Sequence, residues 1–208
     1  MTRARFDDAA RAALTSCVAD IEKDTDAEIV LAVRRRSGAY GHVDFLFGSI
    51  LAFVGLMFLL YSPVAFAPHW VAIDVVLLFV LGWFISSRTS AIRRLFTSSR
   101  FRHEAVRHGA AAMFYEAGIA NTEAEMGVLI YLSLLERRIE VIADRGILKA
   151  VPSMEWNKML FEFHGAGAKP EPNELVNILK EFGCLLANHL PPTGKNPNEL
   201  PDAPRFDF

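Results

Sequence analysis

Charged residues are missing from one long part of this sequence: no lysine, arginine or glutamate occurs between Arg36 and Arg88. Only two acids, Asp44 and Asp74, interrupt a run made mainly of Leu, Val, Phe, Ala and Ile. A helix that faces water carries polar side chains on its exposed face, so this composition argues against a solvated segment. Its length instead fits two membrane-spanning helices of about 20 residues each.

The two spans divide the remaining chain into halves. We predict spans over residues 43–61 and 68–87, joined by a short turn. The predicted organisation is a transmembrane helical hairpin within residues 40–90, inserted into one discontinuous soluble domain, 1–38 plus 98–190, and followed by a proline-rich tail, 191–208. Both halves of that domain must lie on the same side of the membrane, which requires an even number of spans.

Arginines gather next to the spans at the ends away from the turn, whereas near the turn there is only His69, at the start of the second span. The basic residues that we expect at the membrane surface are Arg34, Arg35, Arg36, Arg88, Arg93 and Arg94. By the positive-inside rule both termini face the cytoplasm, and the first residues lack the apolar segment of a secretory signal. Residues 90–99 form an amphipathic, basic segment that either extends the second span or contacts acidic lipid.

Cysteine is scarce, with only Cys17 and Cys184 and no C-x-x-C motif, so a disulfide framework is not indicated. Cys17 belongs to the apolar stripe of the first predicted helix, where burial is a simpler interpretation than reactivity. Catalytic and nucleotide-binding motifs are also missing: there is no H-E-x-x-H, P-loop, G-x-G-x-x-G or G-x-S-x-G. The sequence therefore indicates no cofactor, and no nucleic-acid recognition motif accompanies the arginines.

Periodicity outlines the soluble domain. We predict helices over residues 7–23, 101–117, from 153 to about 164, and 173–190, with a Gly/Pro linker over 165–172. The almost continuous apolar run of residues 28–33 predicts a strand covered on both faces. Residues 127–134 and 138–143 predict a β-hairpin with Glu136 and Arg137 at its tip.

Two features of the spans have more than one interpretation. Asp74 is an acid inside the second span, which is by default a functional hypothesis, although a hydrated or helix-paired carboxylate near the far head groups is the simpler explanation. Gly48, Ser49, Ala52 and Gly55 allow close approach of helices. They serve either packing within the hairpin or association with another subunit.

The order of elements, together with GVLIYLSLLERRIEVIADRGI over residues 127–147 and Asp26-Ala27-Glu28-Ile29-Val30, resembles the TPM domain family. Residues 184–192 and 198–201 resemble its membrane-bound bacterial members, which carry a hairpin as an insertion. The resemblance implies an α/β (α+β) sandwich with a small sheet of three or four strands flanked by helices. It also implies a location in the bacterial inner membrane and, from other members, calcium binding or phosphate-ester hydrolysis.

The candidate metal ligands are Glu123, Glu125 and Asp144, the acids nearest the loops that would hold calcium, although solvated loop acids are the simpler interpretation. This chain has Met126 where many members have asparagine, and Asp144-Arg145-Gly146 where they have a glycine-rich turn. We therefore place a non-catalytic interaction or assembly factor first, with the bilayer and a membrane-protein complex or a second copy as partners. A metal-dependent phosphomonoesterase is the alternative.

Overall fold

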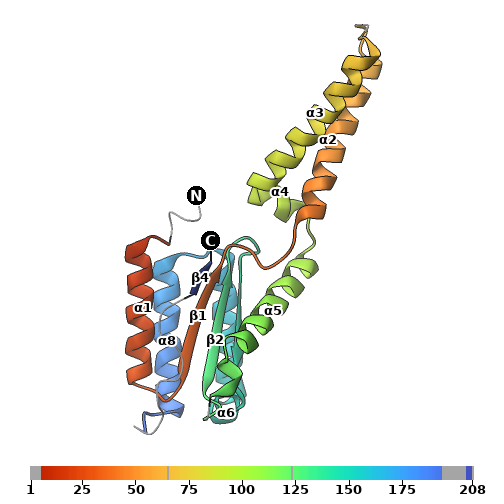
Figure 1. Cartoon of the computed structure of the whole chain (residues 1–208). Coiled ribbons are helices and arrows are strands. Elements are labelled where there is room, and N and C mark those ends of the chain that lie inside the picture. The colour runs from red at the N-terminus through yellow and green to blue at the C-terminus, as the bar shows by residue number, and fades with distance from the viewer. Residues whose placement is uncertain (1–5, 65, 123, 194–204, 208) are drawn as a thin grey trace. The chain divides into compact units, whose positions relative to one another are not determined.

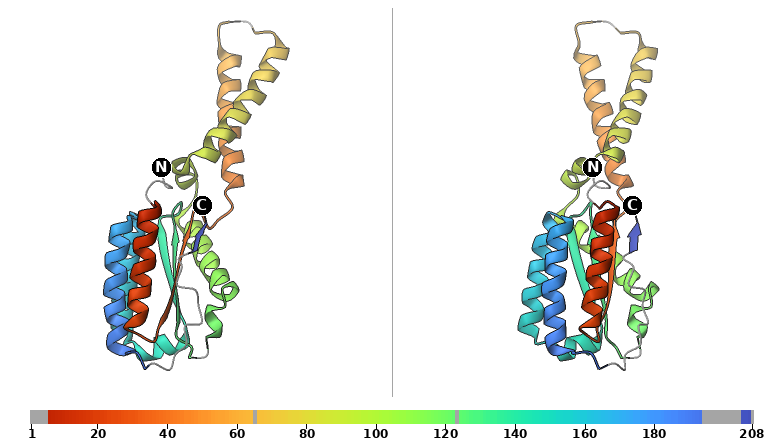
Figure 2. Two further views of the ribbon diagram at one scale, coloured as in Figure 1. Left: turned by 60° about the vertical axis from the view of Figure 1, so that its left-hand side comes forward. Right: turned by 90° about the vertical axis from the view of Figure 1, so that its left-hand side faces the viewer.

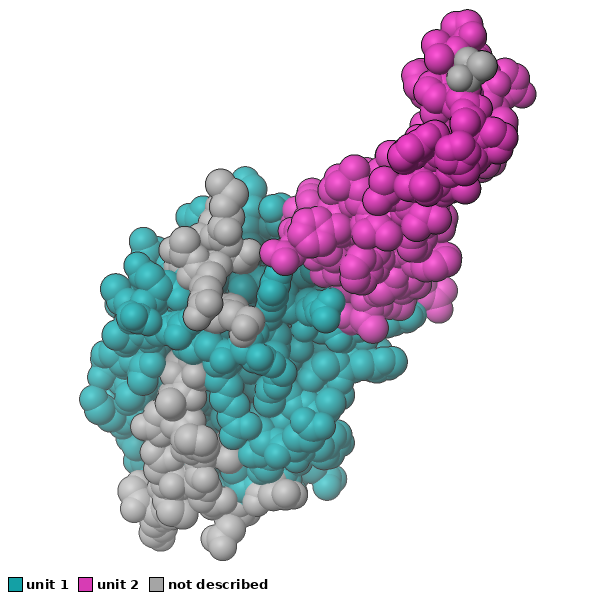
Figure 3. All heavy atoms as spheres, turned by 45° about the horizontal axis from the view of Figure 1, so that its top comes forward, with its two compact units in different colours: residues 1–37, 103–208 teal, residues 38–102 magenta. Residues whose placement is uncertain are grey.

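The computed structural model describes residues 6–64, 66–122, 124–193 and 205–207, and it divides into two compact units. Unit 1 comprises residues 1–37 and 103–208, and unit 2 comprises residues 38–102 (Figure 3). In the described residues the elements are α1 Asp8–Lys23, β1 Glu28–Arg34, α2 Gly41–Tyr61, α3 Pro68–Arg88, α4 Ser90–Leu95, α5 Ser99–Glu116, the 3-10 turn η1 Ile119–Asn121, β2 Gly127–Ser133, β3 Arg138–Ala143, α6 Arg145–Ala150, α7 Ser153–Ala168, α8 Pro172–His189 and β4 Arg205–Asp207.

Unit 1 is built on a four-stranded sheet with the order β3-β2-β1-β4. β1 runs parallel to both β2 and β4, and β3 is antiparallel to β2. In the register of the central pair, Ile29 lies opposite Val128 and Val33 opposite Leu132. Every residue of β1 is buried except Arg34. The structure confirms the prediction of a strand covered on both faces, because a continuous apolar run has no side to expose.

Helices cover the two faces of the sheet (Figures 1 and 2). On one face α1, α7 and α8 pack around Val18, Phe163 and Phe182. On the other face Val106 and Met113 of α5 pack against the sheet. Burial of these apolar side chains is the main stabilising term for such a layered domain.

Three parts of unit 1 differ from the sequence prediction. Within the region predicted as a tail, Arg205–Asp207 forms the edge strand β4 beside β1. Residues 145–150, for which no helix was predicted, form the short helix α6, with Asp144 as its N-cap. Finally, α7 continues to Ala168 through the region predicted as a linker, because its Gly167 faces the β3 backbone: a Cβ there would lie 2.7 Å from the nitrogen of Ile139.

Unit 2 contains a hairpin of two helices, α2 and α3, each of 21 residues and each long and apolar enough to cross a membrane, followed by the short helix α4. The helices cross at two glycines, since a Cβ on Gly82 would lie 2.9 Å from the Cα of Gly48. Ala52 and Gly55 continue this line of small residues toward the turn, and a Cβ on Gly55 would overlap Leu78. The structure therefore uses Gly48, Ala52 and Gly55 for packing within the hairpin, whereas the Ser49 hydroxyl donates to the Phe45 carbonyl of its own helix at 3.0 Å. From the crossing, the two helices diverge toward the turn (Figure 2).

Candidate functional site

A buried ion pair joins Asp44 of α2 to Arg93 of α4. Arg93 donates from Nε to Asp44 Oδ1 at 3.0 Å and from Nη2 to Asp44 Oδ2 at 2.6 Å. The hydroxyl of Ser86 on α3 donates to Asp44 Oδ1 at 2.7 Å. Only 4% of Asp44 and 9% of Arg93 are exposed. One carboxylate therefore connects three helices of unit 2.

Local sequence explains why the three groups meet. Asp44 lies in the first turn of α2, where the unpaired backbone N–H groups and the helix dipole favour a negative charge. Gly48 is one helical turn further along α2, and Gly82 is one turn before Ser86 on α3, so the glycine crossing brings the hydroxyl within reach of the carboxylate. Because each charge has a partner, this group acts as a structural clamp that holds α4 against the hairpin.

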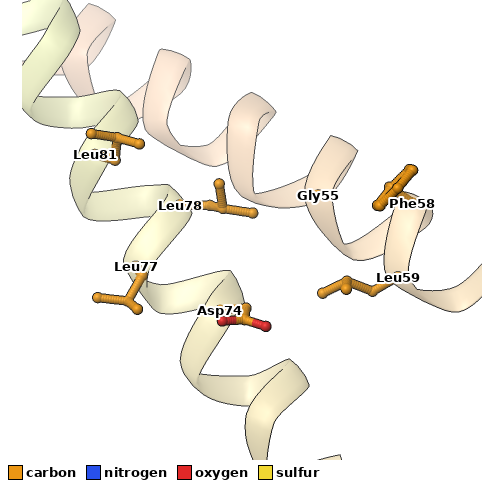
Figure 4. A pocket seen from close by; sticks show the side chains of 7 residues that line it. All are labelled: Gly55, Phe58, Leu59, Asp74, Leu77, Leu78 and Leu81. Carbon is orange, nitrogen blue, oxygen red and sulfur yellow. The ribbon is translucent and has the colours of Figure 1, made fainter. Parts of the chain in front are cut away.

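Asp74, the other acid of the hairpin, has a different environment. It lines a groove of about 450 Å³ between α2 and α3, and the close-up shows its carboxylate directed toward α2, opposite Leu59 (Figure 4). The groove is lined by Gly55, Phe58 and Leu59 of α2 and by Asp74, Leu77, Leu78 and Leu81 of α3. The remaining lining is thus entirely apolar.

Within the described residues no hydrogen bond or ion pair to Asp74 is found, in contrast to Asp44. The sequence offers no lysine or arginine from residue 37 to residue 87 to pair with it. Asp74 lies six residues after Pro68, or about 9 Å along the helix axis. The structure therefore places a carboxylate without a cation partner inside the apolar part of the hairpin.

The arginines predicted at the membrane surface fall into two groups. Arg35, Arg36 and Arg88 have exposed side chains, and the Arg88 guanidinium lies over the Phe84 ring at 5.0 Å. Arg94 is partly buried. Arg34 forms an ion pair with Asp207, and Arg93 is directed inward to Asp44. The inward orientation of Arg93 differs from the prediction, because no local pattern in the sequence indicates that Arg93 pairs with the distant Asp44.

The loops predicted to hold a metal do lie together in unit 1. The backbone N–H of Asp144 donates to the carbonyl of Gly127 at 2.8 Å, and that of Gly146 donates to the carbonyl of Glu125 at 3.0 Å. Asp144 Oδ1 caps α6 by accepting from the Arg145 N–H at 2.7 Å, while Asp144 Oδ2 is buried with no hydrogen-bond partner in the described residues. Glu125 is exposed and has a positive φ of 54°. Glu123 lies outside the described residues.

These residues fit calcium only in part. Asp144 Oδ2 is a carboxylate oxygen with an unused lone pair, which is the type of ligand that calcium prefers. However, six to eight oxygens are needed, and no group of three or more acidic, histidine or cysteine side chains is found among the described residues. The described part of the loops supplies a single oriented donor rather than a set, and calcium binding stays a prediction.

A polar cluster that the sequence analysis missed lies where β1 ends and the chain leaves for the hairpin. The hydroxyls of Ser37 and Tyr131 are 3.0 Å apart, and the backbone N–H of Ser37 donates to Glu136 Oε1 at 2.9 Å. Ser133 donates its hydroxyl to the other oxygen of Glu136, which is only 4% exposed. Burial raises the pKa of Tyr131, and the hydrogen bond from Ser37 opposes that shift. The buried Glu136 thus fixes the exit of β1.

The sequence predicts Glu136 at the polar tip of the β-hairpin, whereas the structure buries its side chain. The positive φ of Arg137, 54°, marks a tight turn that directs Glu136 inward. The signal available in the sequence was Ser133 three residues before Glu136, at the end of a buried strand. That spacing alone did not distinguish a buried carboxylate from a solvated one.

No family model matches the chain, and no curated protein matches it either. The structure is similar to the NMR structure of BA42 protein from the psychrophilic bacterium Bizionia argentinensis, with a TM-score of 0.56 and 16% sequence identity. The similarity covers 95% of this chain and 92% of that chain. At this level of identity it shows a shared fold alone.

Proposed function

We propose that the protein is an integral membrane protein with a TPM-type domain that acts as a non-catalytic interaction or assembly factor for a membrane complex. One observation carries the membrane assignment: the hairpin directs large apolar side chains outward and its charged pair inward. The apolar side chains that are at least half exposed include Phe45, Phe53, Val54, Phe58, Leu60, Trp70, Val76, Leu77, Val80 and Leu81. A soluble protein rarely exposes so large an apolar surface.

The proposed topology places both termini in the cytoplasm. The division into units supports it, because the chain leaves unit 1 after Ser37 and returns at His103, with two candidate spans between them. Arg35 and Arg36 are exposed and precede the first span, and the exposed Arg88 ends the second span. The turn between the spans, residues 62–67, contains no basic residue. This distribution favours the bacterial inner membrane with unit 1 inside.

The burial and hydrogen bonding of the polar groups favour an interaction role over catalysis. The carboxylates of Asp44 and Glu136 are both buried and hydrogen-bonded by serine hydroxyls, which is the arrangement of structural groups rather than of a nucleophile with its base. The hairpin, in contrast, carries an acid in an apolar groove. The group that favours binding of a partner, the acid in the apolar groove, therefore lies in unit 2.

A metal-dependent phosphomonoesterase is the second candidate, and the unpaired Oδ2 of Asp144 is the observation that favours it. Metal-assisted hydrolysis needs several fixed ligands and an open coordination position. Of the two candidate ligands that the structure describes, Glu125 and Asp144, only Asp144 has such an oxygen. This candidate accordingly ranks second.

Reporter fusions and alkaline extraction test the membrane assignment together. Fusions after the first and after the last residue should both report the cytoplasm, a fusion within residues 62–67 should report the opposite side, and carbonate at high pH should leave the protein in the membrane. Release by carbonate, or opposite signals at the two ends, would contradict the proposal. For the enzymatic alternative, phosphate-ester turnover with Ca²⁺, Mg²⁺ or Mn²⁺ that disappears in Asp144→Asn would reverse the ranking.

A further inference from the structure

The hairpin contains two acids with opposite surroundings, and the difference points to a binding site. Asp44 is neutralised by Arg93 of the following helix α4, whereas no ion pair or hydrogen bond to Asp74 is found in the described residues. In a bilayer an isolated carboxylate is unfavourable unless it is paired or hydrated. Residues 37–87 supply no lysine or arginine, so the two spans offer no such cation to Asp74, and a basic partner for it would belong to another polypeptide.

We infer that the groove around Asp74 binds a transmembrane helix of a partner protein that carries a lysine or arginine at the depth of Asp74. This inference rests on the proposed membrane insertion. It names the chemistry of the partner: an apolar helix with one basic side chain, about 9 Å from the end of the span that lies on the side of the turn. Asp74 is the residue that selects it.

The shape of the groove agrees with this occupant. The helices lie in contact at Gly48 and Gly82, and they diverge toward the turn (Figure 2), where the groove lined by Asp74 lies between them. The groove has a volume of about 450 Å³. This space can receive side chains of a helix packed on the outside of the hairpin.

Charge decides between a second copy and a different protein. In an assembly of two copies through this groove, the residues meeting Asp74 would come from α2 and α3, whose only lysine or arginine is Arg88 at the end of α3 away from the turn, and which hold one further Asp, Asp44. Two such copies would bring two carboxylates together, which is unfavourable in an apolar environment. A basic helix of another protein satisfies Asp74, and the apolar lining, mainly leucine and phenylalanine, packs against the rest of that helix.

The experiment uses the full-length protein, labelled with a fluorescent donor at Cys184 and reconstituted in phosphatidylcholine vesicles. Acceptor-labelled model peptides provide the partner: a 21-residue leucine-rich helix with one lysine six residues from the end on the turn side. The control peptides replace that lysine by leucine or move it to six residues from the other end. Energy transfer reports association, and carbonate extraction of the same vesicles reports insertion.

The lysine peptide at the matched depth should associate with wild type and with Asp74→Glu, and association should fall about tenfold in Asp74→Asn. Ile73→Ala, which changes the neighbouring residue outside the groove lining, should behave like wild type. The leucine peptide and the shifted peptide should bind no better to wild type than to Asp74→Asn.

Equal binding of the leucine peptide would overturn the role of charge, and equal binding of the shifted peptide would overturn the assigned depth. Energy transfer between copies that disappears in Asp74→Asn would identify a second copy as the occupant and overturn the inference. Absence of peptide binding to inserted protein would reject it while leaving the proposed membrane function intact. Protein that carbonate releases would reject both.

Discussion

The hydroxyl oxygens of Ser37 and Tyr131 lie 3.0 Å apart, which joins the middle of the sheet to the residue at which the chain leaves unit 1. Tyr131 lies in β2 opposite Ala32 of β1, and a Cβ on Gly109 of α5 would lie 2.8 Å from the Tyr131 hydroxyl. The contact therefore needs a glycine on the helix above it. Through this contact and Glu136, the first residues of the connection to the hairpin have a defined position on the sheet.

The raised pKa of Tyr131 predicts a specific response to alkaline pH. A phenol whose pKa is higher in the folded state contributes stability that is complete below about pH 10 and is lost as pH rises through the folded pKa. We expect wild type to be more stable than Tyr131→Phe by about 1 kcal/mol at neutral pH. This advantage should shrink above pH 10, as measured by urea unfolding at a series of pH values. A difference that grows with pH would contradict the assignment.

Breaking the Asp44 and Arg93 pair should destabilise unit 2 strongly. Asp44→Leu or Arg93→Leu alone leaves a buried charge without its partner, at a cost of about 3–5 kcal/mol. The double variant should recover most of that loss, because no unpaired charge remains. Thermal unfolding in detergent micelles measures all three variants. Additive losses in the double variant would show that the two residues act independently.

Two glycines of α7 form a matched pair. A Cβ on Gly165 meets nothing within 4 Å, whereas one on Gly167 would lie 2.7 Å from the Ile139 nitrogen. Gly165→Ala should therefore stabilise the protein by about 0.4–1 kcal/mol through the entropy of the unfolded chain. Gly167→Ala should destabilise it by about 1–3 kcal/mol, because the β3 backbone must move. Urea unfolding distinguishes them, and equal effects would contradict the position of α7 against β3.

The two cysteines should differ in reactivity. Cys184 is exposed, whereas Cys17 is buried, and burial raises the pKa of its thiol. Since the thiolate is the reacting species, iodoacetamide at pH 8 should modify Cys184 rapidly and Cys17 only after denaturation. Mass spectrometry of wild type and Cys184→Ser follows both sites. Rapid labelling of Cys17 in the native protein would show that α1 is not packed as described.

The sequence predicted most elements correctly because their signals are local. The continuous apolar run of β1 and the three- and four-residue spacing of Leu14, Cys17, Val18 and Ile21 depend only on neighbouring residues, and the structure buries them as expected. Helix α7 is longer than predicted. A glycine in a helix lowers stability unless a close contact requires it, so the glycines here predict a linker. The contact between Gly167 and β3 cannot be recognised from the sequence.

The candidate site was less predictable because its pairings join distant residues. Asp44 and Arg93 are separated by 49 positions and by a complete helical hairpin, so Arg93 resembled the exposed arginines beside it. Ser37 and Glu136 are separated by 99 positions. Asp74 can be identified from the sequence alone, because an acid within an apolar span is recognisable without knowledge of distant residues. Its groove became visible only with the position of α2.

The edge strand β4 has a further consequence for association between chains. β1 would otherwise offer an open row of backbone hydrogen-bonding groups, to which a strand of another molecule can add. Near its start the N–H of Ile29 donates to Glu22 Oε1 at 2.9 Å, and near its end Ala32–Arg34 pairs with Arg205–Asp207. A chain shortened before Arg205 would therefore expose the unpaired edge of β1. Such a chain would self-associate through this edge while its domain remains folded.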